Sequence, residues 1–304
     1  MVKKSNRQSV LLTGASGFLG SYILEALLDA DYPVVVLKRD VSDLWRIKHL
    51  LKRVKVYTYG LFSVNTILKK HNIGIIIHAA TNYGRGLDNY HEIVDTNVML
   101  PLKILEVARD TPVKAFINID TLLPAYLSAY SLSKSQFVEW MRFFSPGIQM
   151  VNLKIEHFYG PRDDQRKFIV RILSKICRGC SSIALTKGTQ KRDFIFVTDV
   201  VDAVMLVLKN LQKFNKFSEF QIGTGRSIPI RDFVSLLYDA VKKYKKGEVK
   251  TKLDFGAVAC RKGEPKEIKA DISLLGKLGW KPRMTLSEGI RKTVIWYLNS
   301  TTKE

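Results

Sequence analysis

The first part of the chain alternates short apolar runs with segments whose apolar residues recur at helical spacing. Apolar runs that are nearly continuous are typical of parallel strands buried on both faces of a sheet. We expect strands at 9–13, 33–37, 54–58, 73–80 and 113–119, with helices between several of them. This order predicts an α/β fold built on a Rossmann-type doubly wound parallel sheet.

A glycine-rich segment separates the first expected strand from the first expected helix. It runs Gly14-Ala-Ser-Gly17-Phe-Leu-Gly20 and precedes the helical pattern SYILEALLDA. In this context the first glycine permits a tight turn, the second lets a pyrophosphate approach the backbone, and the third lets helix and strand pack closely. The alternative is a purely structural turn. The segment predicts a dinucleotide site at a helix N-terminus, formed by Gly14, Ser16, Gly17, Phe18, Leu19 and Gly20.

The residues that follow the second strand bear on the choice of cofactor. An NAD-binding protein is expected to carry an acidic residue here, which holds the ribose 2′-hydroxyl. This chain has Lys38 and Arg39 instead. A guanidinium can bind a 2′-phosphate that a carboxylate would repel. The pair therefore indicates NADP(H), whereas in the alternative Asp40 takes the acidic role.

Composition and charge exclude several classes of protein. The chain has 46% hydrophobic and 25% charged residues and a formal net charge of +21. Its basic residues are spread along the whole sequence without a zinc-finger or RNA-binding motif, so we expect no nucleic-acid partner. Cys177 and Cys180 lack a second pair of ligands, and we expect free thiols and no metal. Without an apolar run long enough for a bilayer, and without a signal sequence, we expect a cytoplasmic protein with no membrane partner.

The stretch AYSLSKSQFVEW, residues 129–140, holds a tyrosine and a lysine four residues apart at the start of an amphipathic helix. Tyr130 and Lys134 would share one face of that helix. The chain has 12 tyrosines and is rich in lysine, so about one such spacing is expected by chance. Taken alone, the pair leaves open both a catalytic role and an ordinary helical one.

Several segments, taken in order, resemble the extended short-chain dehydrogenase/reductases, the NAD-dependent epimerase/dehydratase family. They are TGASGFLG, HAAT at 78–81, the Tyr130–Lys134 stretch, LKIEHFYGP at 153–161, KRDFIFVTDVVDA at 191–203 and RKGEPKEIKADISLLGKLGW at 261–280. The resemblance covers nearly the whole chain. It implies a mainly NADP(H)-binding Rossmann domain at 1–155. It also implies a smaller C-terminal α/β domain at 156–304 that binds a nucleotide sugar, with 191–225 returning to the Rossmann core.

The resemblance also implies roles for individual residues. Tyr130 would be the acid/base, and Lys134 would contact the nicotinamide ribose and lower the pKa of the tyrosine. Thr121 would hydrogen-bond the sugar oxygen that is transformed. Ser128 is the alternative, because the segment between Thr121 and Tyr130 is unusually short. Further cofactor contacts would come from Ala79, Ala80 and Thr81.

Three reactions are common in this family, namely 4-epimerisation, 4,6-dehydration and ketoreduction. Dehydration needs an acid and a base directly after the threonine, where this chain has Leu122 and Leu123. Epimerases keep NAD bound, whereas Lys38 and Arg39 favour an exchangeable NADPH. The sequence thus favours an NADPH-dependent 4-ketoreductase, an oxidoreductase. The alternatives are a nucleotide-sugar 4-epimerase holding NAD and a non-catalytic NADP(H)-binding protein.

Within the family, NYGRG at 82–86 and the short TLLP segment at 121–124 resemble the CDP-abequose and CDP-paratose synthases. These enzymes reduce C4 of CDP-4-dehydro-3,6-dideoxy-D-glucose to make 3,6-dideoxyhexoses for the O-antigens of bacterial lipopolysaccharide. The resemblance implies a CDP-linked deoxyhexose substrate, with abequose favoured over its C4 epimer paratose. It also implies a homodimer formed by the helices near Asn97 and Phe137. The implied substrate-binding residues are Asn82, Tyr83, His157, Lys167, Phe168, Arg192 and Arg261.

Overall fold

The computed structural model describes residues 7–60, 62–84 and 89–301. The chain divides into two compact units. The first comprises Met1–Lys154 and Val201–Phe220, and the second comprises Ile155–Val200 and Gln221–Glu304. The segment that returns to the first unit is therefore 201–220, whereas the sequence analysis placed it at 191–225. The binding roles given to the two domains stay predictions.

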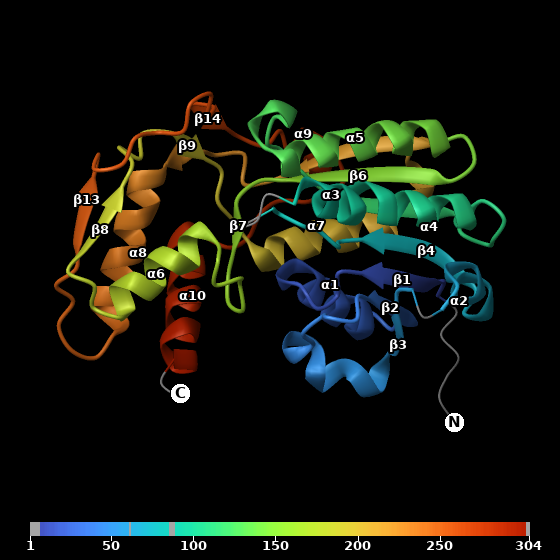
Figure 1. Cartoon of the computed structure of the whole chain (residues 1–304), viewed down its shortest axis with the longest axis horizontal. Helices are drawn as coiled ribbons and strands as arrows, with labels where there is room; N and C mark the ends of the chain where they lie inside the picture. Colours follow the sequence, from blue (N-terminus) through green and yellow to red (C-terminus); the bar gives the residue numbers. More distant parts are fainter. Residues whose placement is uncertain (1–6, 61, 85–88, 302–304) are drawn as a thin grey trace. The chain divides into compact units, whose positions relative to one another are not determined.

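The first unit is built on a seven-stranded sheet with the strand order β11-β6-β5-β4-β1-β2-β3. The pairs β1–β2, β1–β4, β2–β3 and β4–β5 are parallel. This is the order of a doubly wound Rossmann sheet, and the predicted fold class is confirmed (Figure 1). The strands are β1 (Ser9–Thr13), β2 (Val34–Lys38), β3 (Lys55–Thr58), β4 (Ile73–His78), β5 (Ala115–Thr121), β6 (Gln149–Ile155) and β11 (Phe217–Ile222).

Helical segments connect these strands. Two of them matter for the site: α1 follows the glycine-rich turn, and α5 follows β5. The helical segments are α1 (Phe18–Asp29), η1 (Trp45–Arg53), α2 (Val64–Lys70), α3 (Tyr90–Val94), η2 (Asp95–Met99), α4 (Leu100–Ala108), η3 (Ala125–Leu127), α5 (Ala129–Phe144), α7 (Val197–Lys209) and η4 (Leu211–Lys213).

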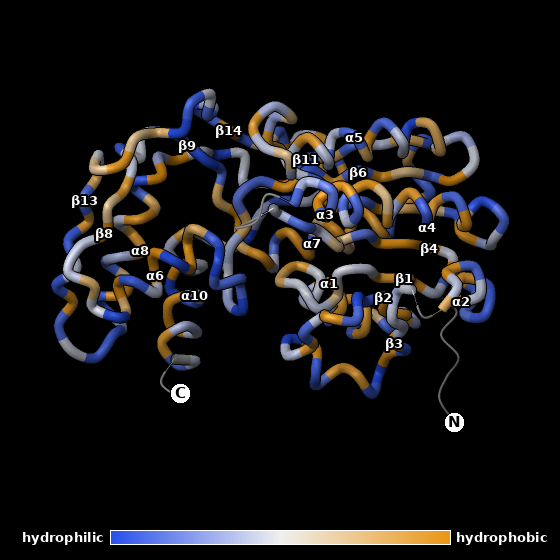
Figure 2. Tube along the Cα trace, viewed as in Figure 1, coloured by the Kyte–Doolittle hydropathy of each residue, from blue (hydrophilic) through white to orange (hydrophobic). Residues whose placement is uncertain are grey.

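The core of the first unit joins the central strands to α4 and α5. Every residue of β4 is buried, and Figure 2 shows β4 and β6 mainly in the hydrophobic colour. Phe116 of β5 packs on Phe137 of α5, with their ring centroids 5.9 Å apart. Burying a side chain of this size contributes about 1.5–3 kcal/mol. This packing fixes α5 against the sheet and so determines where its first residues lie.

The helical stretch that precedes β5 is not continuous. It consists of α3, a π-helical turn η2 and α4, with Pro101 in the first turn of α4. Proline has no N–H to donate to the carbonyl four residues earlier, which weakens a regular helix just before it. The wider π turn is compatible with that loss and adds one residue to the turn.

The second unit contains three small sheets, with strand orders β10-β7, β12-β9-β14 and β13-β8. No helix among the described residues is both long and apolar enough to cross a bilayer. The elements of this unit are β7 (Phe158–Tyr159), α6 (Phe168–Cys177), β8 (Ser182–Leu185), β9 (Lys191–Arg192), β10 (Ile195–Phe196), β12 (Ile228–Pro229), α8 (Ile230–Tyr244), β13 (Lys252–Phe255), β14 (Glu267–Ile268), α9 (Ser273–Lys277) and α10 (Leu286–Thr301).

Candidate active site

The glycine-rich turn has the geometry expected of a dinucleotide site. Gly14 has a positive φ of 72°, and a Cβ added there would collide with the backbone of Ala79 and Ala80 after β4. A Cβ added to Gly20 would collide with the backbone of Gly14. Gly17 is exposed and caps the N-terminus of α1 in an extended conformation. At Gly14 and Gly20 the turn therefore admits no side chain, and it lies at a helix end that favours an anion.

The end of β2 carries the two basic residues predicted to select the cofactor. The Lys38 ammonium donates to the carbonyls of Arg39 at 3.2 Å and Asp40 at 3.4 Å. Arg39 is exposed, and its backbone N–H donates to Ser42 Oγ at 3.1 Å. A third basic residue, Arg46 of η1, donates from Nη1 to the Ser16 carbonyl of the glycine-rich turn at 3.3 Å.

The start of α5 is set by a capping box. The Ser128 hydroxyl accepts from the Ser131 N–H at 3.1 Å, and the Ser128 N–H donates to Ser131 Oγ at the same distance. The cap places Tyr130 in the first turn, half-buried, where its ring lies 4.9 Å from the ring of Tyr83. Lys134 follows one turn later.

Lys134 is the most unusual residue of the site. Its side chain is only 1% exposed, and Nζ has no hydrogen-bond partner among the described residues. Burial lowers the pKa of this ammonium to about 8, even though the negative charge of Asp120 acts in the opposite direction. A buried polar atom without a partner fits a site that a ligand completes, as expected for a cofactor ribose.

The hydroxyl of Thr121 lies at the carboxyl end of β5. Its Oγ accepts a hydrogen bond from the Leu123 N–H at 3.2 Å. A backbone N–H can only donate, so the hydroxyl proton of Thr121 remains for a ligand oxygen, since no described residue accepts it. The alternative residue, Ser128, has its hydroxyl engaged in the capping box of α5.

A buried asparagine joins the loop after β4 to α5. Asn97 of η2 accepts from the Asn82 N–H at 2.8 Å and donates to the Asn82 carbonyl at 2.9 Å. Its Nδ2 also donates to Ser133 Oγ at 2.9 Å. The side chain of Asn82, predicted to bind substrate, accepts instead from the Gly84 N–H at 2.9 Å. Arg85 and Gly86 of the NYGRG motif lie outside the described residues.

The other predicted substrate residues belong to the second unit, and three of them lie close to a carboxylate. Arg192, 2% exposed, donates from Nη2 to Oε1 of half-buried Glu264 at 2.6 Å. His157 Nδ1 lies 2.9 Å from Oε1 of buried Glu156. Lys167 lies 2.9 Å from Asp163. Phe168 and Arg261 are exposed.

Three contributors were missed by sequence reasoning. Asp120 is buried beside Thr121 and acts electrostatically on Lys134. Arg46 and Asn97 reach the site only through tertiary contacts, so their positions in the sequence gave no signal. The described residues hold no group of three or more His, Cys, Asp or Glu side chains able to bind a metal ion.

These features define a dinucleotide-binding α/β protein of the Rossmann type. A family model described as the NAD dependent epimerase/dehydratase family matches residues 10–223. The chain belongs to this family, and the resemblance read from its motifs is confirmed.

Individual relatives are similar over nearly their whole length. A CDP-abequose synthase of Salmonella muenchen is 31% identical over 295 residues, covering 94% of this chain and 96% of the relative. A UDP-glucuronate 4-epimerase of Thermodesulfobacterium geofontis is 26% identical over 318 residues, covering 94% of this chain and 95% of the relative. The crystal structure of a UDP-glucose 4-epimerase with UDP-glucose from Thermotoga maritima has a TM-score of 0.81 at 23% identity. That alignment covers 98% of this chain and 100% of the other, and it indicates the same fold.

Proposed function

We propose that this protein is an NADPH-dependent 4-ketoreductase of a nucleotide sugar, acting on CDP-4-dehydro-3,6-dideoxy-D-glucose. The product would be CDP-abequose or its C4 epimer CDP-paratose. The observation that carries the proposal is the buried, unpartnered ammonium of Lys134 on the same helix as Tyr130, among the described residues. Burying such a charge is unfavourable, and perturbed groups of this kind concentrate at functional sites.

The residues after Thr121 support reduction over dehydration. Elimination of water would need an acid and a base in this segment, and Leu122 and Leu123 can supply neither. The similarity to a protein named CDP-abequose synthase supports a CDP-linked substrate. Relatives named as 4-epimerases keep epimerisation as the alternative that the experiment must separate.

Basic residues near the glycine-rich turn support NADPH over NAD. Lys38 and Arg39 stand where an NAD site is expected to have a carboxylate. Arg46, which reaches the Ser16 carbonyl, adds a third cation to this part of the first unit. Three cations favour a ligand with an extra phosphate.

Each proposed catalytic side chain has one task in the reduction. When bound, NADPH supplies a hydride to C4 of the sugar. The Tyr130 phenol donates a proton to the C4 oxygen, while the Thr121 hydroxyl donates a hydrogen bond to the same oxygen. The Lys134 ammonium stabilises the phenolate left on Tyr130, which then regains a proton from water. The carbonyl thus becomes a hydroxyl, with carbon reduced and the nicotinamide oxidised.

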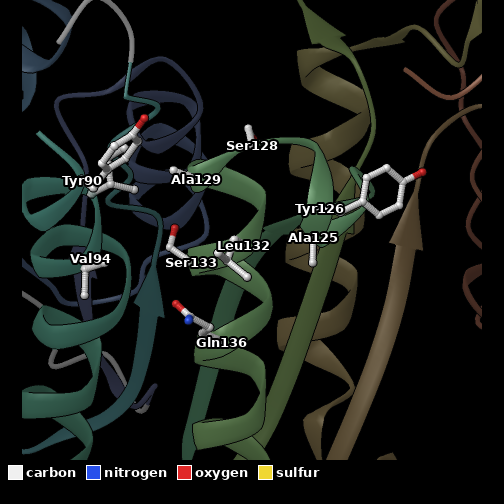
Figure 3. A pocket seen from close by; sticks show the side chains of 10 residues that line it. Tyr90, Val94, Ala125, Tyr126, Ser128, Ala129, Leu132, Ser133 and Gln136 are labelled. Carbon is white, nitrogen blue, oxygen red and sulfur yellow. The ribbon is translucent and has the colours of Figure 1, made fainter. Parts of the chain in front are cut away.

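The outer face of α3 and α5 supports a homodimer. Tyr90 and Val94 of α3 are 62% and 38% exposed, and Leu132 and Phe143 of α5 are 47% and 71% exposed. A hollow of about 450 Å³ is lined by residues of both helices and η3, and Figure 3 shows Tyr90 on one side and the Leu132 turn of α5 on the other. Large exposed apolar side chains gathered on neighbouring helices are typical of an interaction surface. We propose a second copy of the chain as the partner.

The function is tested by supplying purified protein with NADPH and CDP-4-dehydro-3,6-dideoxy-D-glucose. We expect the absorbance of the reduced nicotinamide to fall, with one NADPH consumed for each sugar reduced. Proton coupling constants at C4 of the product then distinguish abequose from paratose. Tyr130→Phe should lower kcat by about 10²–10⁴-fold.

Tyr126→Phe is the matched control, because Tyr126 lies on η3 and is 76% exposed. It should keep nearly full activity. A 4-epimer formed without net loss of NADPH would replace the proposal by an epimerase. If Tyr130→Phe were as active as the wild type, the proposed acid would be wrong.

A further inference from the structure

We infer that Asp120 is the counter-ion of Lys134 and keeps it an ammonium inside the core. Asp120 is then a positioning residue that acts through Lys134. The inference rests on the proposed function only for the role of Lys134 toward the cofactor.

Strand geometry brings Asp120 and Lys134 to the same layer of the first unit. Phe116, Asn118 and Asp120 alternate along β5 and therefore point to one face of the sheet. Phe116 packs on Phe137 of α5, so this face is the one that α5 covers. Lys134 lies one helical turn before Phe137. The carboxylate and the ammonium thus belong to the same packed interface.

Asp120 is anchored in this interface by a hydrogen bond. It is 5% exposed, and its Oδ2 accepts from Asn152 Nδ2 at 2.8 Å. The same Nδ2 donates to Glu219 Oε2 at 2.9 Å, and Glu219 Oε1 lies 2.9 Å from the ammonium of Lys154. Glu219 therefore has its own cation. Asp120 forms no ion pair with a described residue at direct contact distance, so its charge remains for Lys134.

His78, the other titratable group facing Lys134 from the sheet, carries no charge. The Thr13 hydroxyl accepts from the Ala80 N–H at 3.3 Å and lies 2.8 Å from His78 Nδ1. His78 is fully buried, and burial together with the positive charge of Lys134 holds its pKa well below the usual range. A neutral imidazole leaves Asp120 as the ion on the sheet that can stabilise the ammonium.

Three polar atoms of this interface are buried without hydrogen-bond partners in the described part of the chain. They are Lys134 Nζ, His78 Nε2 and Asn118 Oδ1. His78 and Asn118 are register partners on β4 and β5, so their side chains are neighbours. The neutral groups can orient the ammonium, but only the carboxylate can offset its charge.

The first arm of the test needs no ligand. Thermal unfolding is measured for the wild type, Asp120→Asn, Lys134→Met and the double variant, as a double-mutant cycle. Asp120→Asn should lower Tm by about 3 °C or more in the wild type and by clearly less when Lys134 is methionine. Equal effects in both backgrounds would overturn the inference. If Asp120→Asn alone does not fold, the double variant must fold, and its failure would likewise overturn the inference.

The second arm measures the affinity for NADP⁺ as a function of pH, by titration of binding rather than by turnover. The ammonium form of Lys134 is a charge-assisted and therefore stronger donor to the ribose than the neutral amine, so wild-type affinity should weaken above about pH 8. In Asp120→Asn this weakening should begin about one pH unit lower, giving up to about tenfold weaker binding at pH 9 and little change at pH 6. Glu219→Gln is the matched control and should leave the profile unchanged.

The two arms separate the inference from the proposed function. If the protein does not reduce the sugar but the double-mutant cycle shows coupling, Asp120 is still the counter-ion of Lys134 and only the proposed reaction is wrong. If the protein reduces the sugar but the pH profile of NADP⁺ binding is the same in Asp120→Asn and the wild type, the proposed reaction stands and the counter-ion inference is wrong.

Discussion

Replacing Lys134 by methionine should make the protein more stable while removing its function. The substitution keeps the length of the side chain and deletes its charge. In the folded state the pKa of Lys134 falls from 10.5 to about 8, mainly through burial. A shift of one pKa unit corresponds to about 1.4 kcal/mol. Holding the lysine charged in the folded core therefore costs about 3 kcal/mol at neutral pH, relative to the unfolded chain. That cost already includes the attraction of Asp120.

The sign of the pH dependence follows from the lowered pKa. Between pH 8 and 10.5 the unfolded chain binds a proton at Lys134 that the folded chain does not, so stability of the wild type rises with pH. The advantage of Lys134→Met should be fully present below pH 8 and decline toward zero as the pH approaches 10.5. Near neutral pH it should amount to about 3 kcal/mol.

Urea unfolding at several pH values provides the assay, with the slope of the transition checked for two-state behaviour. Lys103→Met serves as the control, because Lys103 is exposed on α4 and its charge is solvated. A Lys134→Met variant no more stable than the wild type at pH 7 would refute the reasoning. So would an advantage that stays constant up to pH 10.

Further predictions address the turn, the cofactor and the interface. Gly20→Ala should cost about 1–3 kcal/mol in urea unfolding because its Cβ meets backbone, whereas Gly276→Ala, which meets nothing within 4 Å, should not destabilise the protein. Combining Lys38→Asp with Arg39→Ala should weaken NADPH binding at least tenfold and leave NADH binding equal or better, and an unchanged preference would refute the assigned selectivity. Phe143→Asp should shift the protein toward a monomer in analytical ultracentrifugation, and a wild type that is already monomeric would contradict the proposed dimer.

The fold was predictable because its strongest local signals agree with its packing. Parallel strands buried on both faces leave long apolar runs, as in β4, and a glycine-rich turn between strand and helix has few structural alternatives. The π turn at η2 was missed because its hydrophobic pattern does not distinguish one extra residue in a helical turn. Pro101 contributes to the π turn, but the effect of a proline on a helix depends on the tertiary contacts around it.

The candidate site was predictable only as far as its motifs extend. Tyr130 and Lys134 are recognisable together because helical spacing puts them on one face. The burial of Lys134, by contrast, depends on β4, β5 and α5 meeting, and spacing along the chain does not reveal which elements meet. Asp120 and Arg46 illustrate the same limit, since each acts on a residue of another element. The roles given to the site residues remain predictions for the experiments above.

The π turn at η2 makes the length of this segment a constraint in its own right. One residue of a helix corresponds to a rotation of about 100°, so deleting a single residue from η2 would turn α3 by that amount relative to α4. Tyr90 would leave the exposed face, and Asn97 would lose its contacts with Asn82 and Ser133. The number of residues in η2 therefore matters as well as their identity, and selection on this segment would act against insertions and deletions.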